Sequence, residues 1–199
     1  ACAPYRRLSL CNKNMEKMGR TSTTKLDLLA DVCMAAKYEG ESITLNYPKY
    51  EADIHHVLCW HEVSQIGDIV RGRDLYRGGG RGRKQLDDSL KKIFGKIYDD
   101  VTSTNGKLKT RYGSDAPEFF KLREDWWTEN RETVWKALTC EAPNNAQYFR
   151  GTCGSDEKNA TLASHQCRCK DEEGKSETDQ VPTYFDYVPQ YLRWFEEWA

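Results

Sequence analysis

The stretch from Arg71 to Tyr98 has the residue types that could recognise an anionic partner. It holds nine basic and three acidic side chains, a local charge of +6 in a chain whose formal net charge is −1. Arginine guanidinium groups bind sulfate, carboxylate and phosphate oxygens in pairs, and a cationic loop leading into a cationic helix face suits an extended polyanion. We therefore expect a glycan-binding track made of Arg71, Arg73, Arg77, Arg81, Arg83 and Lys84, extended by Lys91, Lys92 and Lys96.

Two other interpretations of these charges stay open. Asp87–Lys91 and Asp88–Lys92 have the i,i+4 spacing of ion pairs on an ordinary solvated helix. The segment RGGGRGR, residues 77–83, is also similar to segments that contact single-stranded nucleic acid. The chain as a whole has no net basic charge, which argues against nucleic acid as a partner.

The eight cysteines could form a disulfide framework. This count in 199 residues is typical of an extracellular module, and the alternative is a cytosolic protein with buried thiols. Cys167 and Cys169 are too close in sequence for an easy mutual bond, so each should seek a distant partner such as Cys153 or Cys140. We expect disulfides to involve Cys2, Cys11, Cys33, Cys59, Cys140, Cys153, Cys167 and Cys169.

Catalytic and metal-binding patterns are weak by comparison. Histidines 55, 56 and 61 lie near Cys59, but Gln65 stands where a His-Glu-x-x-His motif needs its second histidine. His165 with Cys167 and Cys169 could form a zinc corner, although disulfide bonding is favoured for these cysteines. Neither a Gly-x-Ser-x-Gly nor a phosphate-binding loop is present. We expect no enzyme activity, no cofactor and no metal.

The elements that must position these residues follow a helical period. Thr24 and Asp27 give a capping box at the start of a helix that carries Leu26, Leu29, Cys33 and Ala36. A second helix is expected from about residue 52 to 71, ended by Gly72, and a third through residues 86–97. A brief strand is possible at residues 43–45, and residues 77–83 are expected to be irregular.

Five of the six tryptophans lie in the two remaining amphipathic segments. In residues 115–140, Asp115 should cap a helix with Glu118 completing the box, and the buried face should carry Phe119, Leu122, Trp126, Val134 and Leu138, widened by Trp127 and Trp135. A last helix should begin near Asp186, with Pro189 in its first turn, and bury Val188, Tyr191, Leu192, Phe195 and Trp198. Residues 154–180 are polar and predict a long disulfide-pinned loop.

Several segments together carry a family resemblance. They are residues 3–11 (APYRRLSLC), 66–76 (IGDIVRGRDLY), 122–127 (LREDWW) with 135–140 (WKALTC), 148–150 with 167–169, and 181–198. Their types and order resemble the Duffy-binding-like adhesion domain, alpha type, of the variant erythrocyte membrane proteins of malaria parasites. Residues 55–65 depart from the family, which would have alanine, arginine and phenylalanine there.

The resemblance implies a mainly helical, cysteine-rich ectodomain module that has no enzymatic activity. It implies cytoadhesion and rosetting on the surface of the infected erythrocyte. The partners would be heparan sulfate, blood-group sugars or a complement receptor, together with neighbouring domains of the same polypeptide. A protein receptor, or an antigenic module without a strong ligand, is the alternative.

The sequence therefore predicts an all-α, disulfide-stabilised domain with long loops. We expect three parts: residues 1–51 as a loop-rich mixed subdomain, 52–150 as a helical bundle, and 151–199 as the truncated start of a third helical subdomain. No apolar run approaches the roughly 20 residues that span a bilayer. We expect an extracellular location without direct membrane insertion by this fragment.

Overall fold

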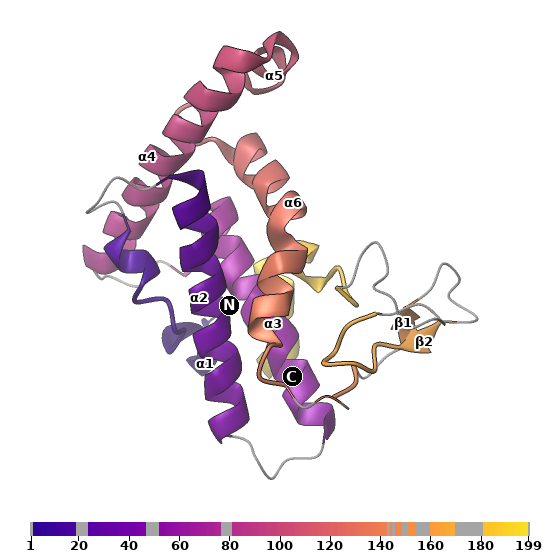
Figure 1. The fold of residues 1–199 in the computed structure, drawn as a ribbon. Coiled ribbons are helices and arrows are strands. Elements are labelled where there is room, and N and C mark those ends of the chain that lie inside the picture. The colour runs from indigo at the N-terminus through magenta and orange to yellow at the C-terminus, as the bar shows by residue number, and fades with distance from the viewer. Residues whose placement is uncertain are drawn as a thin grey trace.

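The computed structural model describes residues 2–18, 24–46, 52–76, 81–142, 144, 146–148, 151–153, 160–169 and 181–198, without the side chains of residues 46, 52–60, 81–83 and 197–198. The α-helices are α1 (Tyr5–Leu8), α2 (Lys25–Asn46), α3 (Ala52–Arg71), α4 (Arg81–Thr104), α5 (Gly106–Tyr112), α6 (Phe120–Leu138) and α7 (Gln190–Trp198). Two short 3-10 helices, η1 (Met15–Lys17) and η2 (Phe185–Tyr187), and two strands, β1 (Gly151–Cys153) and β2 (Thr161–Leu162), complete them. The all-α prediction is confirmed (Figure 1).

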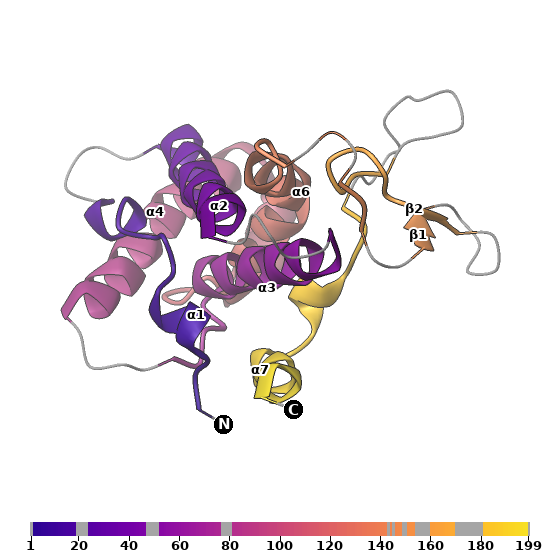
Figure 2. The ribbon, with the colours of Figure 1, turned by 90° about the horizontal axis from the view of Figure 1, so that it is seen from below.

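Three helices form the centre of the molecule. α2, α3 and α6 pack on one another, α4 lies outside them, and α7 lies on the side of α3 away from α2 (Figure 2). The indoles of Trp127 and Trp135 are fully buried in α6. α2 and α6 approach so closely at Gly40 that a Cβ there would collide with the carbonyl oxygen of Leu138. Burial of these large apolar side chains is the main stabilising contribution of the core.

The start of α6 differs from the predicted capping box. The helix begins at Phe120, and Phe119 before it has a left-handed backbone with φ 57°. Asp115 still caps the helix, because its carboxylate accepts hydrogen bonds from the backbone N–H groups of Lys121 and Leu122 at 2.9 Å each. Glu118 does not complete a box; it forms an ion pair with Lys91 of α4 at 2.8 Å.

Three other expectations about the elements are wrong. Residues 43–45 continue α2 instead of forming a strand, since Ile43 is buried on the same helix face as Leu28 and Val32. Residues 81–83 are the first turn of α4 and not irregular loop. The last helix begins at Gln190, and it buries Arg193 and Trp194 while Tyr191, Leu192 and Phe195 are exposed.

One described disulfide joins the cysteine-rich segment. Cys153 of β1 is bonded to Cys169, with Cα atoms 5.3 Å apart, and β1 pairs antiparallel with β2 between them. Residues 154–159 and 170–180, the rest of the expected long loop, lie outside the described residues, as does the side chain of Cys59.

The expectation of disulfides is not met at three cysteines. Cys11, Cys33 and Cys140 are thiols in the structure. The first two are partly buried at the N-terminal segment and on α2, whereas Cys140 is exposed just after α6. The thiols therefore sit on separate elements, and folding brings only Cys153 and Cys169 to bonding distance among the described pairs.

Candidate receptor-binding surface

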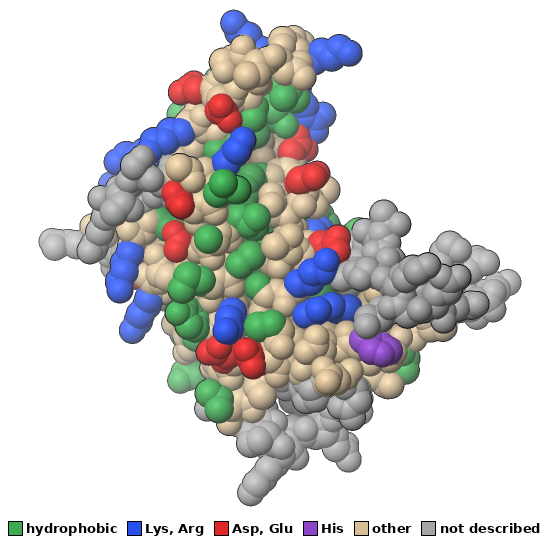
Figure 3. All heavy atoms as spheres, in the orientation of Figure 1, with side chains coloured by type: hydrophobic (Ala, Val, Ile, Leu, Met, Phe, Trp, Pro, Cys, Tyr) green, Lys and Arg blue, Asp and Glu red, His purple; other side chains and the backbone are tan. Residues whose placement is uncertain are grey.

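The outer face of α4 presents three of the predicted cations to solvent. Lys84, Lys92 and Lys96 are exposed, and none of them forms an ion pair with another described side chain. At 1.5 Å of rise per residue, Lys84 and Lys96 are roughly 18 Å apart along the helix axis. Figure 3 shows Lys and Arg side chains gathered along the left edge of the molecule, over α4 and η1. These lysines form an extended cationic face.

Lys91 lies on the same helix but its charge is already compensated. Its ammonium group is 3.1 Å from Asp87 and 2.8 Å from Glu118. Hydrogen bonds to Glu118 and then Asp87 raise the pKa of Lys91. The i,i+4 interpretation of Asp87–Lys91 is therefore confirmed, and Lys91 is a weaker candidate for binding an anion than Lys92.

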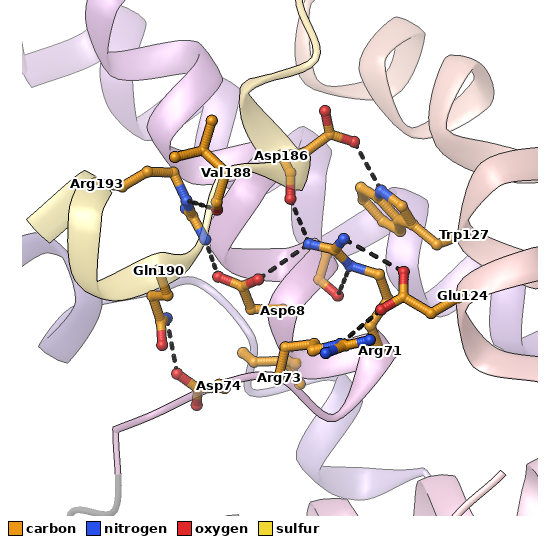
Figure 4. Close-up of polar contacts among 12 residues, drawn as sticks. Asp68, Arg71, Arg73, Asp74, Glu124, Trp127, Asp186, Val188, Gln190 and Arg193 are labelled. Atoms are coloured by element: carbon orange, nitrogen blue, oxygen red, sulfur yellow. Dashed lines mark hydrogen bonds and ion pairs between the residues drawn. The ribbon is translucent and has the colours of Figure 1, made fainter. Parts of the chain in front are cut away.

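Arg71, a predicted primary contact, is instead a structural residue. It is only 4% exposed, and its guanidinium bonds to Asp68 Oδ1 at 3.0 Å, to Glu124 Oε2 at 3.4 Å and to the carbonyl oxygen of Asp186 (Figure 4). The prediction for Arg71 is wrong. Arginine is usually a surface residue, but folding brings two acids and a carbonyl oxygen around this one and buries it.

The four remaining predicted arginines have different outcomes. The side chain of Arg73 is 60% exposed and bonds to Glu124 Oε1 at 2.6 Å, so it is accessible but paired. Arg77 lies outside the described residues. Arg81 and Arg83 occupy the first turn of α4, and their side chains also lie outside the described part. Among the described side chains of the predicted track, those that the structure brings together on one helix face are lysines.

The residues that carry the family resemblance build a buried polar junction. Asp68 of α3 pairs with Arg71 of the same helix and with Arg193 of α7. The second pair places α7 against α3 (Figure 4). Burial raises the pKa of Asp68 to about 6, against the opposing effect of the two arginines. Buried charges are tolerated when they are paired in this way. Sequence reasoning gave Asp68 and Arg193 no role.

The second half of the junction is centred on Asp186 of η2. Its carboxylate accepts hydrogen bonds from Trp127 Nε1 at 2.8 Å and from Arg131 Nε at 3.0 Å. Gly67 of α3 lets the Trp127 ring approach, since a Cβ there would lie 2.7 Å from the indole. The junction therefore fixes α3, α6, η2 and α7 relative to one another.

His61 belongs to this interior and has no sign of a ligand role. It is buried, with its ring 5.2 Å from that of Phe185 in an edge-on contact. Burial, followed by the charges of Arg193 and Arg6, lowers the pKa of His61 to about 4. In the part of the chain that the structure describes, no group of three or more His, Cys, Asp or Glu side chains could hold a metal ion.

A second exposed surface runs along η2 and α7. Tyr191 and Phe195 lie one helical turn apart on α7 and are 53% and 72% exposed, and Tyr187 of η2 is 38% exposed with its hydroxyl 2.9 Å from Thr128 Oγ1 of α6. The sequence assigned Tyr191 and Phe195 to the core because they match a helical period, but Arg193 and Trp194 face α3 instead. Exposed aromatic side chains in a row are typical of protein-contact surfaces.

The fold is a mainly helical domain whose helices are joined by a buried polar junction. The model of the Duffy binding domain family matches residues 1–193. The chain therefore belongs to the Duffy binding domain family. No helix within the described residues is long and apolar enough to cross a membrane.

Several solved structures resemble the whole chain. The N-terminal NTS-DBL1-alpha and CIDR-gamma double domain of PfEMP1 from the Plasmodium falciparum varO strain is 38% identical, with a TM-score of 0.79 over 100% of this chain. The DBLβ domain of PfEMP1 IT4var13 bound to ICAM-1 is 30% identical over 100% of this chain, with a TM-score of 0.71. Another PfEMP1 DBLβ domain, bound to human ICAM-1, is 27% identical over 97%, with a TM-score of 0.69.

The chain spans only part of these structures. It covers 27% of the double domain and 44% and 38% of the two DBLβ chains. None of the curated proteins compared with the chain matches it significantly.

Proposed function

We propose that the chain is a receptor-binding adhesion module, of the alpha type, in a variant antigen on the surface of the infected erythrocyte. Membership of the Duffy binding domain family supports this proposal, and so do the two similar DBLβ domains that are bound to ICAM-1. The module has no enzymatic role. We also propose that the module divides into three parts, residues 1–51, 52–150 and 151–199.

The leading ligand is a sulfated, heparan-sulfate-like glycan, and a blood-group glycan is the alternative sugar ligand. The observation that carries this proposal is the face of α4 with the exposed residues Lys84, Lys92 and Lys96, none of which forms an ion pair with a described acid. Arg73 lies in the segment that leads toward α4 and adds a partly compensated charge. An ammonium group without an acidic neighbour gains more from a sulfate than one already in an ion pair.

A host protein receptor is the second candidate. The exposed aromatic row of Tyr191 and Phe195 on α7 favours it, because aromatic side chains supply much of the binding energy at protein interfaces. The two candidates make opposite predictions about salt. Binding to a glycan weakens steeply as salt screens the charges, whereas binding through the aromatic row changes little.

Binding of the oxidised domain to immobilised heparin across a salt series tests the glycan proposal. The variant Lys84→Ser, Lys92→Ser, Lys96→Ser should bind at least about tenfold more weakly, a loss of about 1.4 kcal/mol. The matched control removes three other exposed lysines with Lys107→Ser, Lys109→Ser, Lys121→Ser and should retain affinity. Equal losses in both variants would mean that only overall charge matters and would reject a defined site on α4.

A further inference from the structure

A groove separates the N-terminal segment from α2. It encloses about 1060 Å³ and is lined by residues between Ser9 and Met18 on one side and by α2 residues between Asp27 and Tyr38 on the other. The α2 side runs over 12 residues, which corresponds to roughly 16 Å or three helical turns. The groove is therefore long enough to hold about three turns of a second helix.

The groove has an apolar base and an apolar rim. Leu10 and Met18 are buried beneath it, and Ala30 and Tyr38 of α2 line it. Tyr38 is 44% exposed, and Met34, one turn before it on the same helix face, is 45% exposed. Figure 3 shows hydrophobic side chains running down the length of α2. Burying this strip would be favourable for any partner with a matching apolar stripe.

The two walls of the groove carry opposite charges. Lys13 and Lys17 stand on the N-terminal side, exposed and without an ion pair to another described residue. Asp27 and Asp31, four residues apart on α2, stand on the opposite side. Asp27 is exposed and accepts hydrogen bonds from the backbone N–H and hydroxyl of Thr24, whereas Asp31 is half-buried beside Asn14.

This arrangement selects between classes of partner. A polysulfated glycan would be attracted by the lysines and repelled by the aspartates along the same groove, and it has no apolar stripe to bury. An amphipathic helix satisfies all three features, since apolar residues at i, i+4 and i+7 would enter the groove over three turns. Acidic residues along one flank would face Lys13 and Lys17, and basic residues along the other would face Asp31.

We propose that this groove binds an amphipathic α-helical segment of a partner protein, one that carries acidic residues on one flank and basic residues on the other. The proposal does not depend on the glycan function, because it uses other residues. Loss of heparin binding would leave it unaffected.

The test uses three synthetic helical peptides that share leucines at i, i+4, i+7 and i+11. One carries glutamates on one flank and lysines on the other, one carries lysines on both flanks, and one carries glutamates on both. Binding to the folded domain is measured by fluorescence anisotropy. The mixed peptide should bind at least fivefold more tightly than either uniform peptide. Reversing the peptide exchanges its flanks, so the mixed peptide can bind in the one direction that matches both walls, and the comparison needs no assumption about that direction.

Variants of the domain locate the site. Ala30→Arg, at an exposed helix position, should fill the groove and weaken the mixed peptide at least tenfold. Lys13→Glu with Lys17→Glu should shift the preference to the all-lysine peptide, whereas the control Lys92→Glu with Lys96→Glu should not. Circular dichroism confirms that each variant is folded.

Three outcomes would overturn the proposal. They are no saturable binding of the mixed peptide, binding that Ala30→Arg leaves unchanged, and self-association of the domain that Ala30→Arg abolishes, which would make a second copy of the chain the occupant.

Discussion

Asp68 and Arg193 form a buried ion pair between α3 and α7 although 125 positions separate them in the chain. Arg71 shares the same carboxylate at 3.0 Å. The pair anchors α7 to the helical core and thereby fixes the aromatic row that α7 presents to solvent. The residues of this junction are buried and paired with one another, so they hold α3, α6 and α7 together.

Removing the carboxylate should therefore destabilise the domain. Asp68→Ala leaves the buried guanidinium of Arg193 without its acid and Arg71 with Glu124 alone, and we expect a loss of about 3 kcal/mol in the free energy of unfolding at pH 7.5. The control Asp100→Ala removes an exposed ion pair with Lys25 and should cost less than about 1 kcal/mol. Denaturant unfolding measures both. If both variants lost a similarly small free energy of unfolding, the junction would contribute little to stability.

His61 should make the domain sensitive to acid. Its folded pKa of about 4 lies below the usual 6.5, so the unfolded chain takes up a proton first and stability falls as pH decreases from 6.5 toward 4. Between pH 7.5 and 5 this amounts to roughly 2 kcal/mol. Well above pH 6.5, His61 is neutral in both the folded and the unfolded chain, so it should not make stability depend on pH.

The variant His61→Leu isolates this contribution. Burial raises the pKa of Asp68 to about 6, which works in the opposite direction over an overlapping range, so the wild-type profile alone is not diagnostic. The free energy of unfolding of the wild type, relative to that of the variant, should fall by roughly 2 kcal/mol on going from pH 7.5 to 5. A difference that stays constant with pH would contradict a buried, neutral His61.

Gly67 should not tolerate a side chain. A Cβ there would lie 2.7 Å from the Trp127 ring, which Asp186 holds in place through Nε1. Gly67→Ala should cost about 1–3 kcal/mol, as overpacked cores do. Gly106→Ala is the matched control, because no heavy atom lies within 4 Å of a Cβ there. Thermal unfolding distinguishes them, and equal midpoints would contradict the close packing of α3 on α6.

The cysteines predict a labelling pattern. Iodoacetamide in denaturant without reductant should modify Cys11, Cys33 and Cys140 but not Cys153 or Cys169. In the folded domain Cys140 should react first, because burial raises the pKa of Cys33 and, together with Glu39, raises that of Cys11 to about 11. Peptide mass spectrometry reads each site. Protection of all of these cysteines in denaturant would restore the expectation of bridges at Cys11, Cys33 and Cys140.

The sequence predicted the helices well where apolar residues repeat with a clear helical period. α3 ends at Arg71 as expected, and Leu86, Leu90 and Phe94 form the buried face of α4. The pattern also placed Trp127 and Trp135 in the core of α6. A period of apolar residues is a local property, so it can be recognised without knowing what the helix packs against.

The buried polar residues could not be predicted in the same way. Arg71 was expected at the surface, and Arg193 was ignored, because an arginine is buried only when distant residues supply its partners. The same reason explains α7, where the pattern favoured Tyr191 and Phe195 as core residues although the bond to Asp68 turns Arg193 inward. Family resemblance indicated which segments matter but not that their charged residues are structural.

The most direct test of the glycan site is a lysine footprint. The folded domain is acetylated at exposed lysines with and without a heparin oligosaccharide, at physiological salt, and each site is quantified by mass spectrometry. The account predicts that the oligosaccharide protects Lys84, Lys92 and Lys96 and leaves Lys107 and Lys109 reactive. Protection confined to other lysines would contradict a glycan site on α4. So would the absence of any protected lysine at oligosaccharide concentrations at which the domain binds heparin.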